Sequence, residues 1–318
     1  MHLVTIETNG HAHPGVIAGD EVLDLSAAGQ FMPDARSVPP TIRGLLAAGA
    51  IALDRVRDLR DQALEGRGSI AHQLRESGAL LRLDQVRLRA PIEDPGMVLA
   101  GGMNYHEHLK EMNTPAPDRP VSFVKSSAAI IGPADPIILP PACPDMVDWE
   151  GEFSAVFGRE CHNVSADDAL QYIAGYTLIN DVSARDWVAP IFQAQGVMGP
   201  IHAWEHNLLG KQFPTFCPLG PVIATADEIA DPGKVNITTT LNGQIMQSAC
   251  TDDLVFSLPQ LIEYYSRFYR FLPGDIITTG SPSGVGYGRN PKVFMRAGDV
   301  VAVRVAGIGT LSNRVVAS

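Results

Sequence analysis

The pattern of hydrophobic and polar positions from residue 148 to residue 158 predicts a β-strand that ends at Gly158. Aromatic and small apolar residues alternate there with polar ones, and successive side chains on a strand point to opposite faces. Glu150 and Glu152 therefore share one face, whereas Phe153 lies on the other face, which is apolar enough to be core. The pattern alone favours an exposed edge strand with two solvated glutamates. If the strand is buried instead, the carboxylates repel each other, and a hard divalent cation would remove that cost.

The beginning of the chain combines short strands with a helical stretch. Alternating patterns separated by Asn-Gly and Gly-Asp turns predict strands over residues 3–7, 13–17 and 21–25. Residues 41–83 carry apolar positions at helical spacing. Pro91 and Pro95 indicate a linker, so we predict an N-terminal accessory domain over residues 1–93 and a second domain over residues 94–318.

The pattern beyond residue 97 is mostly that of strands. Strands are predicted over residues 97–100, 122–131, 137–139, 176–180, 235–241, 244–248, 275–279 and 300–305. Helices are predicted over residues 104–112, 165–173, 182–187 and 254–270, the last of them offset by Pro259. Together the two parts predict an α+β fold that is mostly β.

Composition and charge exclude several classes of protein. The 318-residue chain has a formal net charge of −11, whereas a nucleic-acid binder normally shows a basic face. Its four cysteines form no C-x-x-C pair, so neither a zinc knuckle nor a disulfide framework is indicated. The sequence has neither a signal-peptide pattern nor an apolar run of about 18 residues. We expect a cytoplasmic protein with no nucleic-acid or membrane partner, and a small anionic substrate stays possible because local cations override a global charge.

Two further groups of residues have the chemistry of a site. Asp181 follows the apolar strand that ends at Asn180, where its carboxylate is placed to be a third oxygen ligand beside the two glutamates. The alternative is that Asp181 caps a short helix. His108 and Glu111 are three residues apart and share one face of a helical turn. A carboxylate beside an imidazole suits a general base, although a surface His/Glu pair is the alternative.

Two lysines and two motif matches complete the candidates. Lys125 and Lys211 stand in apolar surroundings, where a lysine can hold an oxyanion or a substrate carboxylate, or can be a snorkelling surface residue. His202-Ala203-Trp204-Glu205-His206 matches the H-x-x-E-H metal pattern, but Pro200 and Gly210 argue against the sustained helix that this motif needs. Residues 280–286 lack the nucleotide-loop and nucleophile-elbow patterns, and favour a tight turn whose backbone N–H groups bind a carboxylate.

Five motifs occur in the order that is typical of the fumarylacetoacetate hydrolase family. They are Asn104-Tyr105-x-x-His108-x-x-Glu111, Asp148-x-Glu150-x-Glu152, Asn180-Asp181-Val182-Ser183-Ala184-Arg185-Asp186, Gly210-Lys211-x-Phe213 with Cys217-Pro218-Leu219-Gly220-Pro221, and Thr279-Gly280-Ser281-Pro282-Ser283-Gly284-Val285-Gly286. The chain resembles that family over roughly residues 97–316, and its first ninety or so residues resemble the family's N-terminal domain only loosely. The resemblance implies a catalytic domain built as a mixed β-roll.

The resemblance also implies roles for individual residues. Glu150, Glu152 and Asp181 would bind Mg²⁺, with Mn²⁺ and Ca²⁺ equally suited to three carboxylates. His108 and Glu111 would activate water on a lid, and Lys211 would be the active-site lysine. The substrate would be bound by Tyr105, Lys125, Arg185, Thr279, Gly280 and Ser281.

Our leading hypothesis is a metal-dependent hydrolase that cleaves a C–C bond in an acylpyruvate-like or β-diketo acid. Such an acid can chelate the metal, which stabilises the departing enolate while water activated by His108 attacks the distal carbonyl. The alternatives are an isomerase, decarboxylase or lyase that acts on a 2-oxo acid at the same site, and a non-catalytic metal-binding protein. The resemblance further implies a homodimer.

Three differences from the family put the substrate in doubt. Trp187-Val188-Ala189-Pro190 follows the Ala-Arg-Asp run where the family often has a glutamine, so one substrate hydrogen bond is expected to be missing. The segment 188–209 would reshape the pocket or contact a second subunit. Ser281 stands where threonine is common, which keeps a hydroxyl group.

Overall fold

The predicted strand over residues 148–158 is divided after Asp148 in the structure, and Glu150 directly precedes the buried strand that carries Glu152. The computed structural model of the chain describes residues 1–65, 69–187 and 194–318. Within these residues β11 (Gly151–Phe157) runs between β12 (Ile173–Asn180) and β17 (Ile276–Thr278), and every residue of β11 is buried. The interpretation as an exposed edge strand is therefore wrong.

The described residues form two main sheets. The larger one, of twelve strands, contains β1 (His2–Thr8), β2 (His11–Ala18), β3 (Glu21–Asp24), β4 (Leu80–Arg82), β5 (Arg87–Arg89), β6 (Val98–Gly102), β7 (Val121–Lys125), β8 (Ile130–Ile131), β11, β12, β14 (Cys217–Thr225) and β17. Its order is β4-β3-β2-β1-β14-β12-β11-β17-β6-β7, with β5 beside β1 and β8 beside β14. The smaller sheet has the order β16-β15-β18-β19-β9, formed by β9 (Ile137–Leu139), β15 (Asn236–Leu241), β16 (Gln244–Cys250), β18 (Val300–Val305) and β19 (Gly309–Ala317). A separate pair joins β10 (Val147–Asp148) to β13 (Ser183–Ala184).

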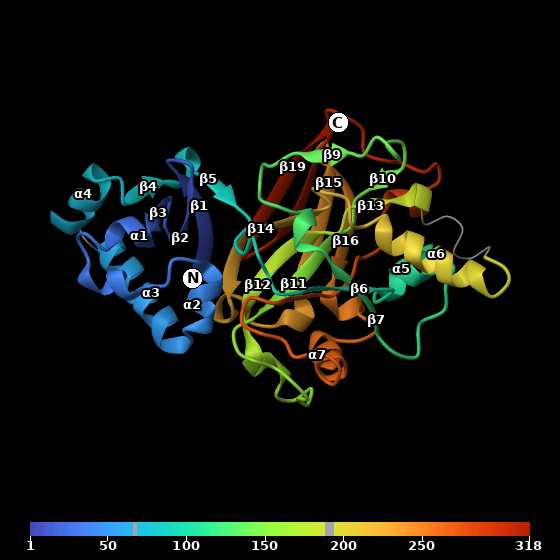
Figure 1. Ribbon diagram of the computed structural model, residues 1–318, viewed down its shortest axis with the longest axis horizontal. Helices are drawn as coiled ribbons and strands as arrows, with labels where there is room; N and C mark the ends of the chain where they lie inside the picture. Colours follow the sequence, from blue (N-terminus) through green and yellow to red (C-terminus); the bar gives the residue numbers. More distant parts are fainter. Residues whose placement is uncertain (66–68, 188–193) are drawn as a thin grey trace.

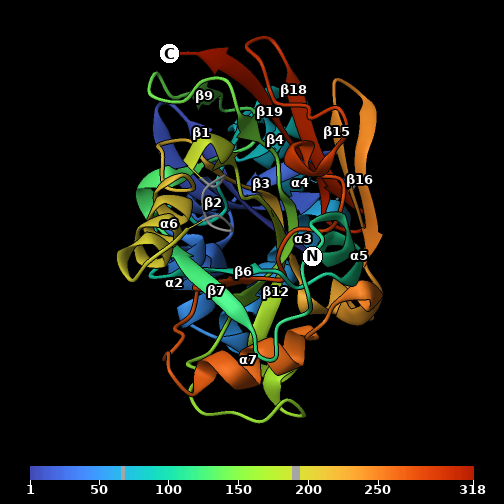
Figure 2. The same cartoon turned by 90° about the vertical axis from the view of Figure 1, so that its right-hand side faces the viewer.

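Apart from the last one, the helices lie at opposite ends of the molecule. They are α1 (Leu25–Ala28), α2 (Ile42–Ala47), α3 (Ala50–Glu65), α4 (Ser69–Glu76), α5 (His106–Glu111), α6 (Met198–Leu209) and α7 (Leu258–Ser266). Figure 1 shows α1 to α4 beside the N-terminal strands, and α5 and α6 at the far end. In Figure 2, which views that end, α5 and α6 lie on either side of the larger sheet's last strands. The α+β fold that is mostly β is confirmed.

The alternation along β11 separates two cores. Phe153, Ala155 and Phe157 pack with apolar residues of β15, β18 and α7, whereas Val156 packs with the core that the N-terminal helices cover. Gly151 stands between the two glutamates, where a β-carbon would lie 2.2 Å from Thr239 Oγ1 on β15. The smaller sheet therefore approaches so closely that only glycine fits at this position.

Three predicted helices differ from the observed structure. Residues 165–173 form turns and a 3₁₀ helix over Ala169–Tyr172, because the chain enters β12 at Ile173. Residues 182–187 form β13 and a 3₁₀ helix over Arg185–Trp187. Helix α7 is shorter than predicted and begins after the Ser257 capping box, with Pro259 in its first turn, where proline is tolerated.

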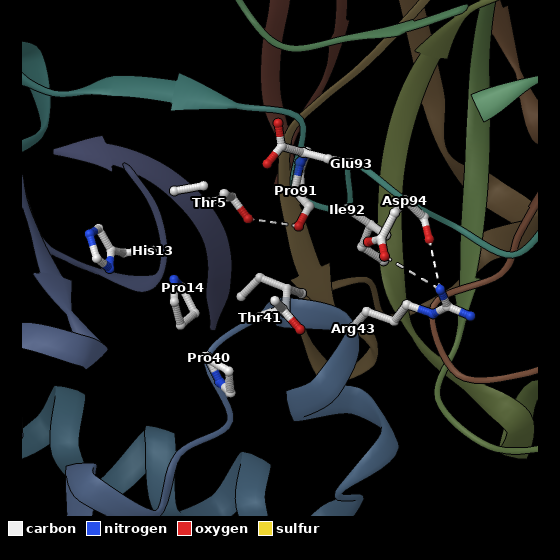
Figure 3. Close-up of a pocket in the computed structure, with 12 residues that line it drawn as sticks. Thr5, His13, Pro14, Pro40, Thr41, Arg43, Pro91, Ile92, Glu93 and Asp94 are labelled. Carbon is white, nitrogen blue, oxygen red and sulfur yellow. Dashed lines mark hydrogen bonds and ion pairs between the residues drawn. The ribbon is translucent and has the colours of Figure 1, made fainter. Parts of the chain in front are cut away.

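The N-terminal strands join the rest of the molecule through the larger sheet, because β1 pairs with β14. A small cavity of about 50 Å³, large enough only for a few water molecules, lies at this junction. Figure 3 shows that Thr5 Oγ1 donates a hydrogen bond to the Pro91 carbonyl (2.8 Å) and that Arg43 Nη1 donates one to the Asp94 carbonyl (2.9 Å). These contacts hold the connecting segment in place, and the domain boundary at residue 93 stays a prediction.

Candidate metal centre and active site

Three carboxylates converge at the end of β11 and β12. One oxygen each of Glu150, Glu152 and Asp181 lies within 4.8 Å of the others, and all three side chains are buried. The register of the two strands holds them together, because the Asp181 N–H donates to the Glu150 carbonyl (2.8 Å). The Glu150 N–H donates in turn to Asn180 Oδ1 (2.8 Å). Among the described residues this is the one His/Cys/Asp/Glu group with such geometry.

Two lysines are paired with these carboxylates. Lys211 Nζ donates to Glu150 Oε2 (2.7 Å) and Asp181 Oδ2 (2.6 Å). Lys125 Nζ donates to Asp181 Oδ1 (2.5 Å) and to the Lys211 carbonyl (2.7 Å). Their ammonium groups are buried, so the interpretation of these lysines as snorkelling surface residues is wrong. Asp181 is bound by two cations and does not cap a helix.

The fourth contributor is an arginine that joins two acids. Arg185 Nε donates to Asp148 Oδ2 (2.8 Å), and Arg185 Nη2 lies 2.6 Å from Glu150 Oε1. Burial would raise the pKa of Glu150, but Lys211 and Arg185 outweigh burial and hold that pKa below its usual range. Burial would likewise lower the pKa of Lys211, and the charges of Asp181 and Glu150 raise it instead.

Glu152 is the carboxylate for which the protein supplies no counter-charge. Neither of its oxygens has a hydrogen-bond partner among the described residues. Burial, with Asp181 and Glu150 close by, raises the pKa of Glu152 well above its usual range. The site holds four buried carboxylates and three buried cations. The cations are paired with Asp148, Glu150 and Asp181, so that Glu152 is left without a counter-charge. An unpaired buried carboxylate beside two other oxygen donors fits a divalent cation.

The predicted dyad lies on α5. His108 Nδ1 is 3.0 Å from Glu111 Oε2, and since an ionised carboxylate only accepts hydrogen bonds, Nδ1 donates and Nε2 is left as a base. The Glu111 carboxylate accepts two further hydrogen bonds from the Gly284 N–H (3.0 and 3.1 Å). It also fits closely against Gly288, where a β-carbon would lie 2.5 Å from Glu111 Cδ. These contacts fix α5 and the orientation of the imidazole.

Asp148 is a site residue that our assignment of roles from the sequence did not include. Its buried carboxylate accepts hydrogen bonds from the backbone N–H groups of Trp149 (2.9 Å), Gly286 (2.7 Å) and Tyr287 (3.0 Å), besides the bond from Arg185. Backbone N–H groups of the glycine-rich turn thus bind two carboxylates of this chain, Glu111 and Asp148, and the binding of a substrate carboxylate by this turn stays a prediction. The position of Asp148, two residues before Glu150, was the available signal.

One cavity is lined by one member of the triad, Glu150, and by one member of the dyad, His108. It has a volume of about 180 Å³ and is lined by Gly101, Gly102, Met103, His108, Leu109, Met112, Thr114, Val121, Phe123, Glu150, Arg185, Trp204, Asn207, Lys211 and Ser281. The imidazole of His108 therefore faces the same space as the metal-ligand candidate Glu150. Trp204 and Asn207 belong to the segment 188–209, which was expected to reshape the pocket or contact a second subunit, but neither residue was assigned a role of its own, because their helix was not predicted.

Three other predicted substrate-binding residues, Tyr105, Thr279 and Gly280, lie deeper than the cavity wall. The Tyr105 side chain is fully buried, with its hydroxyl 3.4 Å from Thr279 Oγ1. Thr279 Oγ1 itself donates to the Phe153 carbonyl (3.0 Å). Gly280 is buried as well, and Ser281 reaches the cavity with its hydroxyl bonded by Gln247 Nε2 (3.0 Å). The structure thus groups these residues around the site, and their roles in binding stay predictions.

The H-x-x-E-H match lies on a helix after all. Helix α6 spans the motif, because Pro200 falls in its first turn, where a proline costs no helical hydrogen bond. His202 and Glu205 are exposed, and the His206 ring packs edge-on against Trp187 with centroids 5.1 Å apart. The motif is absent from the metal-ligand groups of the described residues. Residues 188–193 of the preceding segment lie outside the described part of the chain.

Comparisons with known proteins agree with this geometry. A family model described as fumarylacetoacetate (FAA) hydrolase C-terminal matches residues 97–316. The chain is 40% identical over 298 residues to the mitochondrial oxaloacetate tautomerase FAHD2A of Bos taurus, an alignment that covers 94% of this chain and 85% of the bovine protein.

Solved structures extend the likeness to the whole chain. A fumarylacetoacetate hydrolase from psychrophilic Exiguobacterium antarcticum is 30% identical with a TM-score of 0.77, and the match covers 100% of both chains. A maleylpyruvate hydrolase from Sphingobium sp. SYK-6, solved in complex with manganese(II) and pyruvate, is 26% identical with a TM-score of 0.74 and the same coverage. No helix in the described residues is long and apolar enough to cross a membrane.

Proposed function

This chain belongs to the fumarylacetoacetate hydrolase family, and we propose that it is a metal-dependent tautomerase that interconverts the keto and enol forms of a small 2-oxo acid such as oxaloacetate. The observation that carries the proposal is the single cavity in which His108 faces Glu150 of the acidic triad. The identity to an oxaloacetate tautomerase over 94% of the chain supports this reaction over the C–C hydrolysis that we expected first.

The size and charge of the cavity suit a small acid. Its volume of about 180 Å³ is below the range of roughly 300–1,000 Å³ that is usual for drug-sized ligands. Arg185 and Lys211 line it on the side of the triad. The four buried carboxylates carry four negative charges, and the two lysines and Arg185 carry three positive charges. A divalent ion at the triad would add two positive charges, so the site would have a net charge of about +1. An acidic substrate is attracted to such a site.

Tautomerisation needs one proton to be moved between carbon and oxygen. His108 Nε2 would take the proton from C3 of the substrate, and a proton would then be placed on the 2-oxo oxygen, so that one C–H bond breaks and one O–H bond forms. Glu111 holds the imidazole in the required tautomer by accepting from Nδ1. The reverse reaction uses the same groups in the opposite sense.

Glu150, Glu152 and Asp181 would hold the metal ion, for which we propose Mg²⁺ or Mn²⁺. When bound, the ion would stabilise the negative charge that develops on the 2-oxo oxygen. Lys211 and Lys125 hold Glu150 and Asp181 in place through the contacts already described. Arg185 contacts the other carboxylate oxygen of Glu150 and so helps to fix the orientation of this side chain.

Hydrolysis of an acylpyruvate is the second candidate. The same imidazole could remove a proton from water, and the likeness to a maleylpyruvate hydrolase that contains pyruvate favours it. The two reactions differ in their products, because hydrolysis releases two fragments and tautomerisation releases none.

The test is to give the protein oxaloacetate and acetylpyruvate with Mg²⁺, with Mn²⁺ and with EDTA. Enol formation and decay would be followed by ultraviolet absorbance, and fragments by NMR. We expect metal-dependent acceleration of the keto–enol exchange of oxaloacetate, lost in His108→Ala. Pyruvate release from acetylpyruvate without faster exchange would favour the hydrolase. Exchange that is unchanged by EDTA would refute the metal-dependent proposal.

Two further expectations belong with this proposal. The bovine relative is described as mitochondrial, whereas we propose a cytoplasmic location for this chain. We also propose that the chain forms a homodimer, which sedimentation velocity would test directly.

A further inference from the structure

Helix α6 presents two side chains to the cavity in line with the active-site lysine. Trp204, Asn207 and Lys211 are spaced i, i+3 and i+7, which places them along one face of a helix and its continuation, and all three line the cavity. Lys211 reaches the triad from the end of this row. Asn207 and Trp204 therefore stand progressively farther from the triad along the cavity wall.

The end of α6 is held firmly against the site. The N–H of Ala184, the residue directly before Arg185, donates a hydrogen bond to the Gly210 carbonyl (2.9 Å). Gly210 leaves no room for a side chain, because a β-carbon would lie 2.9 Å from the Ala184 carbonyl oxygen. The edge-on packing of His206 on Trp187 adds a second contact. The position of Asn207 relative to Lys211 is thus set by the fold.

The chemistry of the wall changes away from the triad. The cationic side chains that line the cavity in the described residues, Arg185 and Lys211, are both paired with carboxylates of the site. Leu109, Val121 and Phe123 make much of the remaining wall apolar. Asn207 lines this cavity as well, and its carboxamide is able both to donate and to accept a hydrogen bond.

We propose that Asn207 and Trp204 determine which 2-oxo acid is bound, an inference that rests on the proposed function. Asn207 donates a hydrogen bond to an oxygen at C4 of the substrate, while the 2-oxo carboxylate end lies at the triad. Trp204 keeps 42% of its surface exposed and stands at the rim, where its indole limits the length of the chain beyond C4.

The test compares two ligands that share the metal-binding end. Oxalate lacks a C4 group, whereas 3,3-difluorooxaloacetate has a C4 carboxylate and no C3 proton to lose, so that binding is measured without turnover. Calorimetry on the Mn²⁺-loaded protein would give both dissociation constants for wild type, Asn207→Leu and Asn207→Asp. Glu205→Gln, on the exposed side of the same helix, is the matched control.

We expect Asn207→Leu to weaken difluorooxaloacetate binding about tenfold, the effect of one lost hydrogen bond to a charged group. Asn207→Asp should weaken it further through like-charge repulsion, while oxalate binds all variants alike. Trp204→Ala should improve binding of the longer 2-oxoadipate relative to difluorooxaloacetate. Equal weakening of oxalate, or no change for either ligand, would overturn the assignment and leave the proposed function standing. A wild-type protein that binds neither ligand would overturn both.

Discussion

Removal of the Lys125 ammonium group tests the charge balance of the buried site. In the metal-free protein this group pairs with Asp181 Oδ1, and both side chains are fully buried. Lys125→Met keeps most of the apolar stem and removes the charge. Lys211 still pairs with Asp181 Oδ2, but it is shared with Glu150, so one buried carboxylate loses its counter-charge.

The expected cost follows from the burial of the pair. Breaking a buried ion pair by removing one partner typically costs about 3–5 kcal/mol. Because Asp181 keeps one of its two cations, we expect the lower end, about 3 kcal/mol in the free energy of unfolding. A divalent ion at the triad would restore most of this loss, since it supplies the missing positive charge and binds only the folded state.

Urea unfolding, followed by tryptophan fluorescence with EDTA and again with Mn²⁺, measures both effects. Lys110→Met is the matched control, because the ion pair of Lys110 with Glu107 is exposed to solvent and should contribute little to stability. A Lys125→Met protein that unfolds within 1 kcal/mol or so of wild type in EDTA would refute the reasoning. So would a loss that Mn²⁺ leaves unchanged.

Three other predictions concern residues of the segment 148–152. Gly151→Ala should destabilise the protein by about 1–3 kcal/mol or more, measured by urea unfolding, because the new methyl group overlaps Thr239. Burial beside two other carboxylates raises the pKa of Glu152 in the metal-free protein, so the folded state holds a proton that the unfolded state releases. Its unfolding free energy should fall as the pH rises above 4.5, and Glu152→Gln should flatten this dependence. Asp148→Asn should weaken Mn²⁺ binding roughly 10- to 100-fold in calorimetry, because Arg185 loses the partner that orients it toward Glu150.

Local patterns predicted the strands and the carboxylates well. The period-two alternation placed Glu150 and Glu152 on one face, and the end of a buried strand placed Asp181 beside them. The spacing of His108 and Glu111 predicted their hydrogen bond. Each of these relations depends on residues that are close in the sequence or on the regular geometry of a strand or helical turn.

The contacts that decide the electrostatics depend on distant parts of the chain. Lys125 lies 56 residues from Asp181 in sequence, and no local pattern shows that its ammonium group would be buried against that acid. Helix α6 was not predicted because Pro200 was interpreted as a helix break. Pro200 is the third residue of the helix, and proline is tolerated in the first helical turn. The helix predicted to begin at Ser165 failed for the opposite reason, because good local signals were overridden by the strand that follows.

Binding of Mn²⁺ by the isolated protein tests the central claim most directly. Electron paramagnetic resonance would count the ions bound per chain and would show whether Mg²⁺ displaces them. The account predicts one Mn²⁺ site in wild type, competed by Mg²⁺, and its loss in Glu152→Ala, since Glu152 is the carboxylate left without a partner. Undiminished binding in Glu152→Ala, or no binding in wild type, would contradict the assignment of the triad as the metal centre.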